Sequence, residues 1–429
     1  MFMVIEVVNP GESLWAIARR YGITAEQIAS VNGLDDSERL VPGQALVIPI
    51  ESSVHIVQPG ESLWTIAQRY GVTPEQLAQM NNIANPAQLA VGQRLLVPRA
   101  GTKPTIETNG YLQPSSPERD RSIVQESAEA LTYFSIFQYI AETDGSLTPP
   151  NDGPALEAIR NTFSVPMMVI TNFEEGTFSA EKARAIFDNP DVRQTLIDNV
   201  INTLTEKQFF ALNVDFEHIF PEDREKYNAF LRDLTARVHE TGKLISTALA
   251  PKTSAAQVGQ WYEAHDYPAH GTIVDFVIIM TYEWGWSGGP PMAVAPIPQV
   301  RQVLDYAVSV IPPEKIMMGA PLYGYNWTLP YVQGGPFAPT ISPQAAVRLA
   351  RDTGAIIQYD YTAQAPFFRY YDNQGREHIV WFEDARSMQA KFNLIKEYGL
   401  RGISYWVLGQ AFPQNWVLLE DNFTIRKLK

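Results

Sequence analysis

The distribution of apolar and polar residues changes character near residue 105. From there to the end of the chain, short apolar runs alternate with segments whose apolar residues recur at helical spacing. One such segment follows residue 220, where an acidic first turn precedes Tyr227, Phe230 and Leu234. The runs lie at residues 106–112, 131–139, 165–173, 209–217, 244–251, 274–283, 315–324 and 401–409. Because buried parallel strands are near-continuous apolar runs, the pattern predicts an α/β TIM barrel.

One stretch interrupts this alternation. Between the seventh and eighth runs, about residues 325–378 contain strand-like pieces at 356–361 and 367–371 and a turn-forming Asp-Asn-Gln-Gly at 372–375. We interpret this stretch as a small α+β insertion on the loop face of the barrel. Barrel chemistry lies at the carboxyl ends of the strands, so functional residues are expected where the runs end.

The first hundred residues contain an internal repeat. Pro-Gly-Glu-Ser-Leu-Trp at residues 10–15 recurs 49 positions later at residues 59–64, and further matches keep that register. Each copy begins with a short apolar strand and a Pro-Gly turn, continues with two helices and ends with a strand; Thr24 and Thr73 begin the second helices with capping boxes. The sequence therefore predicts βααβ modules at residues 3–50 and 53–99, a boundary near Gly101, and a barrel at 104–429.

These copies resemble the LysM module in their Gly-Glu-Ser-Leu-Trp start, the Asn after the second helix and the Gly-Gln-x-Leu-x-Ile/Val-Pro ending. The resemblance implies binding of glycans that contain N-acetylglucosamine, in peptidoglycan or chitin. The interpretation we favour for Trp15 and Trp64 is that they belong to the module cores. The family's glycan groove implies binding residues in two loops of each copy: Gly11, Glu12, Ser13 and Asn32, and Gly60, Glu61, Ser62 and Asn81.

The fourth barrel run ends in polar residues at alternate positions. Asn213, Asp215 and Glu217 follow an apolar stretch, and side chains two apart in a strand lie on the same side. Buried carboxylates need a use or a partner, and two such neighbours raise the pKa of one of them, which suits a general acid. The alternative interpretation is a strand end that becomes polar at the surface.

The same segment resembles the D-x-x-D-x-D-x-E signature of glycoside hydrolase family 18. Residues 277–283, 318–324 and 402–406 resemble that family's sixth, seventh and eighth strands. The resemblance implies that Glu217 is the general acid and base, that Asp215 orients the substrate's 2-acetamido group, and that Tyr282 hydrogen-bonds to that group. It also implies substrate-assisted cleavage with retention. The implied substrate-binding residues are Asn213, Met280, Trp406, Glu283 and Trp284, with Trp406 as the floor under the sugar.

Two positions depart from that signature. Phe210 replaces its first Asp, which changes packing, and Asn213 replaces its second. Because an amide cannot take a proton from Asp215, we expect a different rate and pH optimum from those of the family.

Two LysM-like copies before such a barrel, together with residues 280–286 and 288–292, resemble the spore cortex-lytic N-acetylglucosaminidases of endospore-forming bacteria. The resemblance implies hydrolysis of β-1,4 linkages after N-acetylglucosamine in peptidoglycan or cortex fragments. The implied location is the cell wall, the spore coat and cortex, or the extracellular space. Residues 1–6 lack the basic and apolar regions of a conventional signal peptide.

Composition removes other classes of function. The net charge of −14 argues against a nucleic-acid partner. With 0 Cys there is no thiolate metal site, the 6 His lack metalloprotease spacing, and no cofactor or metal is expected. No apolar run reaches the roughly 18 residues of a membrane span. His218, on the opposite side of the strand from Glu217, is interpreted as a packing residue, and the oligomeric state is not indicated.

Two alternatives remain at this stage. One is a chitinase or an endo-β-N-acetylglucosaminidase, because LysM modules also bind chitin. The other is a non-catalytic chitinase-like protein that only binds glycan, although such lectins usually lose the Glu of the signature, which is present here as Glu217.

Overall fold

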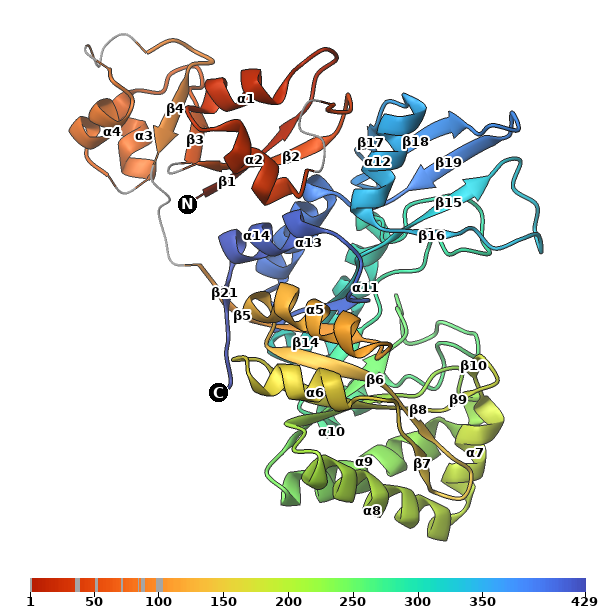
Figure 1. Cartoon of the computed structure of the whole chain (residues 1–429). Helices are drawn as coiled ribbons and strands as arrows, with labels where there is room; N and C mark the ends of the chain where they lie inside the picture. The colour runs from red at the N-terminus through yellow and green to blue at the C-terminus, as the bar shows by residue number, and fades with distance from the viewer. Residues whose placement is uncertain are drawn as a thin grey trace.

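The computed structural model describes residues 2–34, 39–50, 53–70, 72–83, 85, 89–97 and 103–429. Two small modules precede a closed barrel that carries an insertion (Figure 1). The predicted boundary near Gly101 and the predicted end of the second module lie outside the described residues.

Each module is a two-stranded antiparallel sheet with two helices. The first consists of β1 (Phe2–Val7), α1 (Leu14–Tyr21), α2 (Ala25–Asn32) and β2 (Ala45–Ile50), and the second of β3 (Ser53–Ile56), α3 (Leu63–Arg69), α4 (Pro74–Met80) and β4 (Arg94–Val97). The capping boxes at Thr24 and Thr73 are present, so side chains satisfy the first free amides of α2 and α4. The predicted βααβ modules are confirmed.

The core assignment of Trp15 and Trp64 is wrong. Their side chains are 63% and 60% exposed. Leu14, Ile17 and Ala18 form the buried stripe of α1, and Trp15 lies one residue, or about 100°, away from Leu14 around the helix. The Trp15 ring instead lies under the guanidinium of Arg19.

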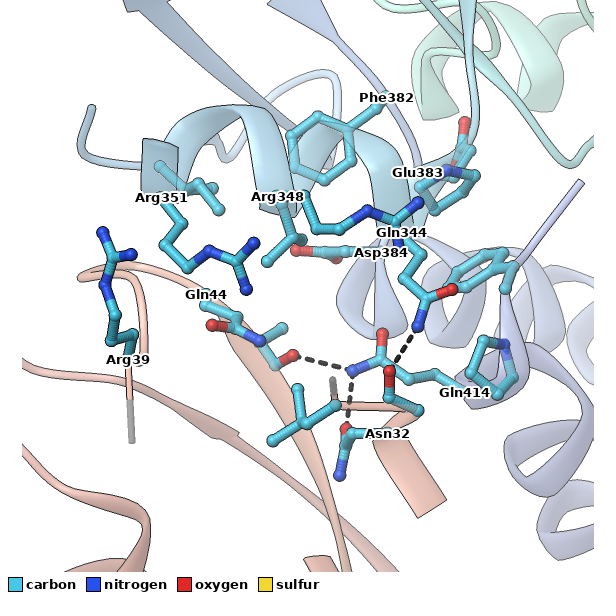
Figure 2. Close-up of a pocket in the computed structure, with 18 residues that line it drawn as sticks. Asn32, Arg39, Gln44, Gln344, Arg348, Arg351, Phe382, Glu383, Asp384 and Gln414 are labelled. Atoms are coloured by element: carbon cyan, nitrogen blue, oxygen red, sulfur yellow. Dashed lines mark hydrogen bonds between the residues drawn. The ribbon is translucent and has the colours of Figure 1, made fainter. Parts of the chain in front are cut away.

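The first module packs on the catalytic part of the chain (Figure 2). It contacts α12 (Pro343–Thr353), α13 (Ala385–Tyr398) and α14 (Pro413–Asn422). Gln414 of α14 donates hydrogen bonds to the first module at Asn32 and Ala45.

Eight parallel strands form the barrel. They are β5 (Thr105–Leu112), β6 (Tyr133–Ala141), β8 (Val165–Thr171), β11 (Ala211–Asp215), β12 (Leu244–Leu249), β13 (Phe276–Ile279), β14 (Ile316–Pro321) and β20 (Gly402–Trp406). Each pairs with the next, and β20 returns to β5, which closes the sheet. Every predicted run overlaps one of these strands, and the predicted TIM barrel is confirmed. Two short strands, β7 (Leu147–Thr148) and β21 (Thr424–Ile425), pair at its margin.

Helices surround the barrel because each buries one apolar stripe against the strands. The remaining ones are α5 (Pro117–Ser127), α6 (Gly153–Arg160), α7 (Ala180–Asp188), α8 (Pro190–Glu206), α9 (Arg224–Glu240), α10 (Tyr267–Ile273) and α11 (Ile297–Val310). In α9 the predicted apolar positions Tyr227, Phe230 and Leu234 are fully buried. The acidic turn before α9 forms a short 3-10 helix, Pro221–Asp223, whose Asp223 pairs with Arg184.

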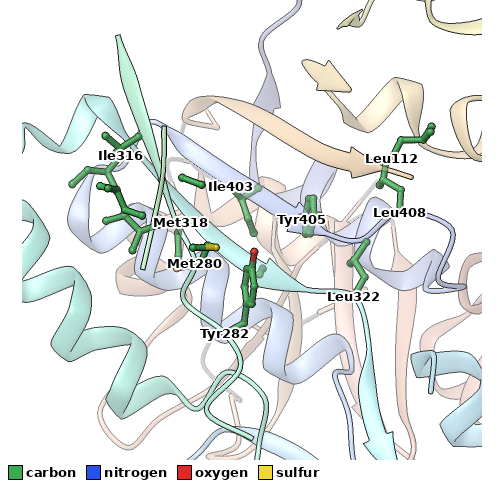
Figure 3. Close-up of a cluster of buried hydrophobic side chains, with 14 of the residues drawn as sticks. Leu112, Met280, Tyr282, Ile316, Met318, Leu322, Ile403, Tyr405 and Leu408 are labelled. Atoms are coloured by element: carbon green, nitrogen blue, oxygen red, sulfur yellow. The ribbon is translucent and has the colours of Figure 1, made fainter. Parts of the chain in front are cut away.

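The core continues beneath the carboxyl ends of the strands (Figure 3). Met318 of β14, with Ile403 and Tyr405 of β20, is fully buried beside Met280 and Tyr282. This packed layer supports the residues at the strand ends, so their side chains project from a rigid base.

The insertion lies between β14 and β20. It is an antiparallel sheet of β15 (Gly324–Thr328), β16 (Thr340–Ile341), β17 (Gln358–Asp360), β18 (Ala365–Tyr371) and β19 (Glu377–Trp381), with α12 beside it. The turn at residues 372–375 joins β18 to β19, and the sheet continues to Trp381, beyond the expected end at 378.

Candidate functional site

A cavity of about 290 Å³ opens at the carboxyl ends of the barrel strands. Residues from seven of the eight barrel strands, or from the loops that follow them, contribute to it, as barrel geometry predicts. The lining residues are Tyr111, Gln113, Phe137, Phe173, Phe178, Asp215, Glu217, Trp261, Met280, Tyr282, Glu283 and Trp406.

The end of β11 places two carboxyl groups in this cavity. Asp215 is the last residue of the strand and Glu217 follows two residues later; they are 5% and 8% exposed. Asn172, just after β8, fixes the backbone of Glu217: its Nδ2 donates to the Glu217 carbonyl oxygen at 2.8 Å, and its Oδ1 accepts from the Glu217 amide at 3.0 Å. The polar strand end is therefore buried, and not a surface terminus.

Burial is the main electrostatic influence on this pair. Desolvation raises the pKa of Asp215 above its ordinary value. Desolvation, followed by the nearby charge of Asp215, raises the pKa of Glu217 well above its ordinary value. Oδ1 of Asp215 is buried without a hydrogen-bond partner among the described residues, which leaves it available to a donor in the cavity.

Trp261 contacts Glu217 from the loop between β12 and α10. Its indole Nε1 donates to Oε2 of Glu217 at 2.5 Å, and this bond lowers the pKa of Glu217 against the effect of burial. The Trp261 ring stacks on His218 with centroids 6.1 Å apart, and His218 also lies beside Phe178. His218 lies outside the lining of the cavity, consistent with a packing role.

Asn213 lies below the cavity, with both ends of its amide engaged. The Tyr111 hydroxyl donates to its Oδ1 at 2.9 Å, and its Nδ2 donates to Oγ of Ser246 at 2.9 Å. Asn213 is fully buried and lies outside the lining. Its position thus suits support of the site more than direct contact with a ligand.

The segment after β13 supplies a second wall. Tyr282 enters the cavity because Gly319 of β14 leaves room for its ring: a Cβ at Gly319 would lie 2.8 Å from Cε1 of Tyr282. Glu283, at a φ of 69°, accepts hydrogen bonds from Tyr323 and, at 2.9 Å, from Tyr325. Burial raises the pKa of Glu283 above its ordinary value.

Aromatic rings form the floor. Trp406, the last residue of β20, packs edge-on against Phe137 at 4.9 Å and Tyr111 at 5.5 Å between ring centroids. Trp284 lies elsewhere: it packs against the barrel core and outside the lining. The structure therefore brings Asp215, Glu217, Met280, Tyr282, Glu283 and Trp406 together in the cavity, and it does not bring Trp284 there.

The sequence did not indicate six of the lining residues. Tyr111 and Gln113 flank the last residue of the first apolar run, and Phe173 ends the third, positions that could have marked them. Phe173 and Phe178 come from a hairpin of β9 (Phe173–Glu174) and β10 (Thr177–Phe178), and Phe137 and Trp261 carry no local signal. Long-range folding alone places Phe137, Phe178 and Trp261 in the cavity.

The predicted LysM residues have structural contacts within their own modules. Glu12 accepts from the Asn9 amide at 3.1 Å, and Ser13 caps α1. Asn32 joins α2 to β2, because its Nδ2 donates to the carbonyl oxygens of Ile28 and Val47 and its Oδ1 accepts from the Val47 amide.

The second copy repeats this arrangement. Glu61 accepts from Gln58, Ser62 caps α3, and Asn81 joins α4 to β4. Gly11 and Gly60, at φ of 78° and 84°, permit the turns before the first helices. Glycan binding by these eight residues stays a prediction.

The barrel, the cavity at its strand ends and the two small modules together define a glycan-cleaving enzyme with appended modules. Residues 152–411 match the model of the glycosyl hydrolases family 18, and residues 7–49 and 55–98 match the LysM domain. The chain belongs to glycoside hydrolase family 18, it carries two LysM domains, and it is a glycoside hydrolase.

Some relatives match over nearly the whole length and others over part of it. The chain is 54% identical over 428 residues to the cortical fragment-lytic enzyme of Bacillus subtilis, covering 99% of both. It superposes on the crystal structure of the Bacillus megaterium spore cortex-lytic enzyme SleL with a TM-score of 0.94 and 46% identity, covering 100% of both chains. A rat di-N-acetylchitobiase is 27% identical over 251 residues, covering 51% of this chain and 65% of the relative.

Within the described residues, no helix is both long and apolar enough to cross a membrane.

Proposed function

We propose that this protein hydrolyses β-1,4 linkages after N-acetylglucosamine in spore cortex peptidoglycan, by a retaining mechanism in which the substrate assists. The observation that carries the proposal is the placement of Asp215 and Glu217, two residues apart at one strand end, in a buried cavity with Tyr282 and Trp406.

This placement favours assistance by the substrate. Enzymes with two independent carboxylates hold them on opposite sides of the scissile bond, whereas Asp215 and Glu217 both enter the cavity from the end of one strand. The third carboxyl group of the cavity, Glu283, is engaged by Tyr323 and Tyr325. The nucleophile that fits is therefore the carbonyl oxygen of the substrate's own 2-acetamido group.

In the first step, protonated Glu217 gives its proton to the glycosidic oxygen as the bond from that oxygen to C1 breaks. The acetamido oxygen bonds to C1 and forms a cyclic oxazolinium ion. Asp215 accepts a hydrogen bond from the acetamido N–H through its free Oδ1 and balances the positive charge. The hydroxyl of Tyr282, kept protonated because burial raises its pKa, donates to the acetamido group.

In the second step, the carboxylate of Glu217 removes a proton from water, which attacks C1 and opens the ring with net retention. The Trp261 N–H stabilises this carboxylate, because an indole nitrogen only donates. Trp406 supports the sugar ring from below through its apolar face.

The proposed substrate follows from the relatives. Enzymes named for lysis of cortex and of cortical fragments match 99% or more of this chain, and LysM domains accompany the barrel here as well. We place the protein at the spore coat and cortex, with the LysM loops binding peptidoglycan.

A chitinase or endo-β-N-acetylglucosaminidase activity is the second candidate. The likeness to di-N-acetylchitobiase over 51% of the chain favours it. Product analysis separates the two. The first candidate releases fragments mainly from cortex, whereas the second cleaves chitin oligomers faster than it cleaves cortex.

The experiment compares wild type with Glu217→Gln on purified cortex peptidoglycan and on chitin oligomers, by reducing-end release and product mass. We expect products with reducing N-acetylglucosamine from cortex, absent in the variant, whose amide keeps the size of the side chain but cannot give a proton. Faster cleavage of chitin than of cortex would select the second candidate, and products with reducing muramic acid would refute both.

A further inference from the structure

The two LysM modules have different surroundings. In the first, every residue of β2 is buried: Leu46 and Ile48 face the module's own core, whereas Ala45 and Val47 face the barrel core. In the second, exposed and buried residues alternate along β4, where Arg94 and Leu96 occupy the equivalent positions and are exposed. One repeat thus has a sheet with two buried faces, and the other has a sheet with one.

Hydrogen bonds fix the first module to the catalytic part (Figure 2). They involve the end of α2, which belongs to the predicted glycan groove, and the turn before β2. Nε2 of Gln414 donates to Oδ1 of Asn32 at 2.6 Å and to the Ala45 carbonyl oxygen at 2.9 Å. The Ile357 amide donates to the Pro42 carbonyl oxygen at 3.0 Å, and Nη2 of Arg386 donates to that of Gly43 at 3.1 Å. Nε2 of Gln344 donates to the Gly33 carbonyl oxygen.

Apolar contacts close the same region. Val41 is 2% exposed and belongs to a hydrophobic cluster of the insertion that includes Phe368 and Phe382. A Cβ at Gly33 would lie 2.6 Å from Cγ of Pro413, so the backbone there touches α14 directly. A sugar chain could enter this side of the first module only after these contacts had opened.

The equivalent part of the second module is open where the structure describes it. Asn82, Val91 and Gly92 correspond to Gly33, Pro42 and Gly43, and all three are exposed, Val91 to 65%. This module packs on the first, where Arg94 donates to the hydroxyl of Tyr21 at 2.6 Å. In Figure 1 the first module accordingly lies between the second module and the insertion.

We propose that the first LysM module is a fixed part of the catalytic unit, and that the second module is the one that binds the glycan. This inference rests on the LysM part of the proposed function. The first module then serves as a rigid spacer, which holds the wall-bound second module at a set position relative to the cavity.

The first test maps binding by hydrogen–deuterium exchange in full-length Glu217→Gln, with soluble peptidoglycan oligosaccharides as the probe. We expect reduced deuterium uptake at residues 58–64 and 77–83 and no change at residues 9–15 and 28–34. Reduced uptake in both modules would overturn the inference while the proposed glycan binding stands. Reduced uptake at the barrel cavity alone would overturn both the inference and the LysM part of the proposed function, but not the hydrolase.

The second test uses a matched pair of glycines. Gly43 and Gly92 are equivalent and have φ of 83° and 84°, so an alanine brings the same backbone strain to each. A Cβ at Gly43 would lie 1.8 Å from the carbonyl oxygen of Ile357, whereas at Gly92 nothing lies within 4 Å.

We expect Gly43→Ala to raise deuterium uptake at residues 39–50 and 354–358, and Gly92→Ala to leave those residues unchanged. Gly43→Ala should still sediment with insoluble cortex, because the second module is intact. Equal uptake at those residues in the two variants would refute the fixed docking, and loss of sedimentation in Gly43→Ala alone would refute the assignment of binding to the second module.

Discussion

Trp261→Phe isolates one hydrogen bond at the proposed acid. The substitution removes the Nε1–H that donates to Oε2 of Glu217 at 2.5 Å and leaves an aromatic ring to stack on His218. The bond stabilises the carboxylate form of Glu217, so its loss raises the pKa of that group.

The magnitude follows from the charge on the acceptor. A hydrogen bond to a charged group contributes about 1.5–3 kcal/mol, and one pKa unit corresponds to about 1.4 kcal/mol, so the pKa of Glu217 should rise by about 1–2 units. Since kcat/KM requires protonated Glu217, the basic limb of its pH profile moves upward by that amount. The plateau of kcat falls by up to about 10–100-fold, because the carboxylate formed on proton transfer loses its donor.

The assay is the pH profile of kcat/KM on soluble cortex fragments, followed by reducing-end release. Trp327→Phe is the matched control: it deletes an indole N–H bonded at 2.9 Å to the Gly289 carbonyl, outside the cavity lining. A basic limb that stays in place in Trp261→Phe, with kcat equal to that of the control, would refute the role of this hydrogen bond.

Three further substitutions test other parts of the structure. Tyr282→Phe removes one donor from the cavity and should lower kcat by about 10–100-fold with an unchanged melting temperature, measured by initial rates and calorimetry. Burial lowers the pKa of His270 from 6.5 to about 3. Below pH 6.5 the unfolded chain therefore binds a proton that the folded chain does not, and the free energy of unfolding decreases as the pH falls from there toward 3. His270→Leu should therefore reduce the loss of unfolding free energy between about pH 7.5 and about pH 4.5 by about 2.7 kcal/mol in denaturant titrations; an equal loss in wild type and variant would contradict this. Lys391→Met leaves the buried carboxyl of Glu383 without its ion-pair partner at 2.8 Å and should lower the unfolding free energy by about 3–5 kcal/mol, whereas a change below about 1 kcal/mol would show that Glu383 is neutral without it.

Local periodicity in the sequence determined the fold. Eight apolar runs marked the eight barrel strands, and the repeat at 49 residues marked both modules, since these signals depend on neighbours within a few positions. The same holds for Asp215 and Glu217: alternation in one strand put both on one side, and the barrel rule put that strand end at the site.

Contacts between distant segments had to come from the tertiary structure. Trp261 reaches Glu217 across 44 residues, and Gln414 reaches Asn32 across 382. Two homologous repeats even differ in burial, because β2 meets the barrel and β4 does not. The sequence by itself therefore determined the elements, the family and the pair of carboxyl groups. Only the tertiary structure decided which further aromatic residues, such as Trp261, surround that pair and which module is fixed to the barrel. Such contacts depend on how whole elements pack and leave no period along the chain.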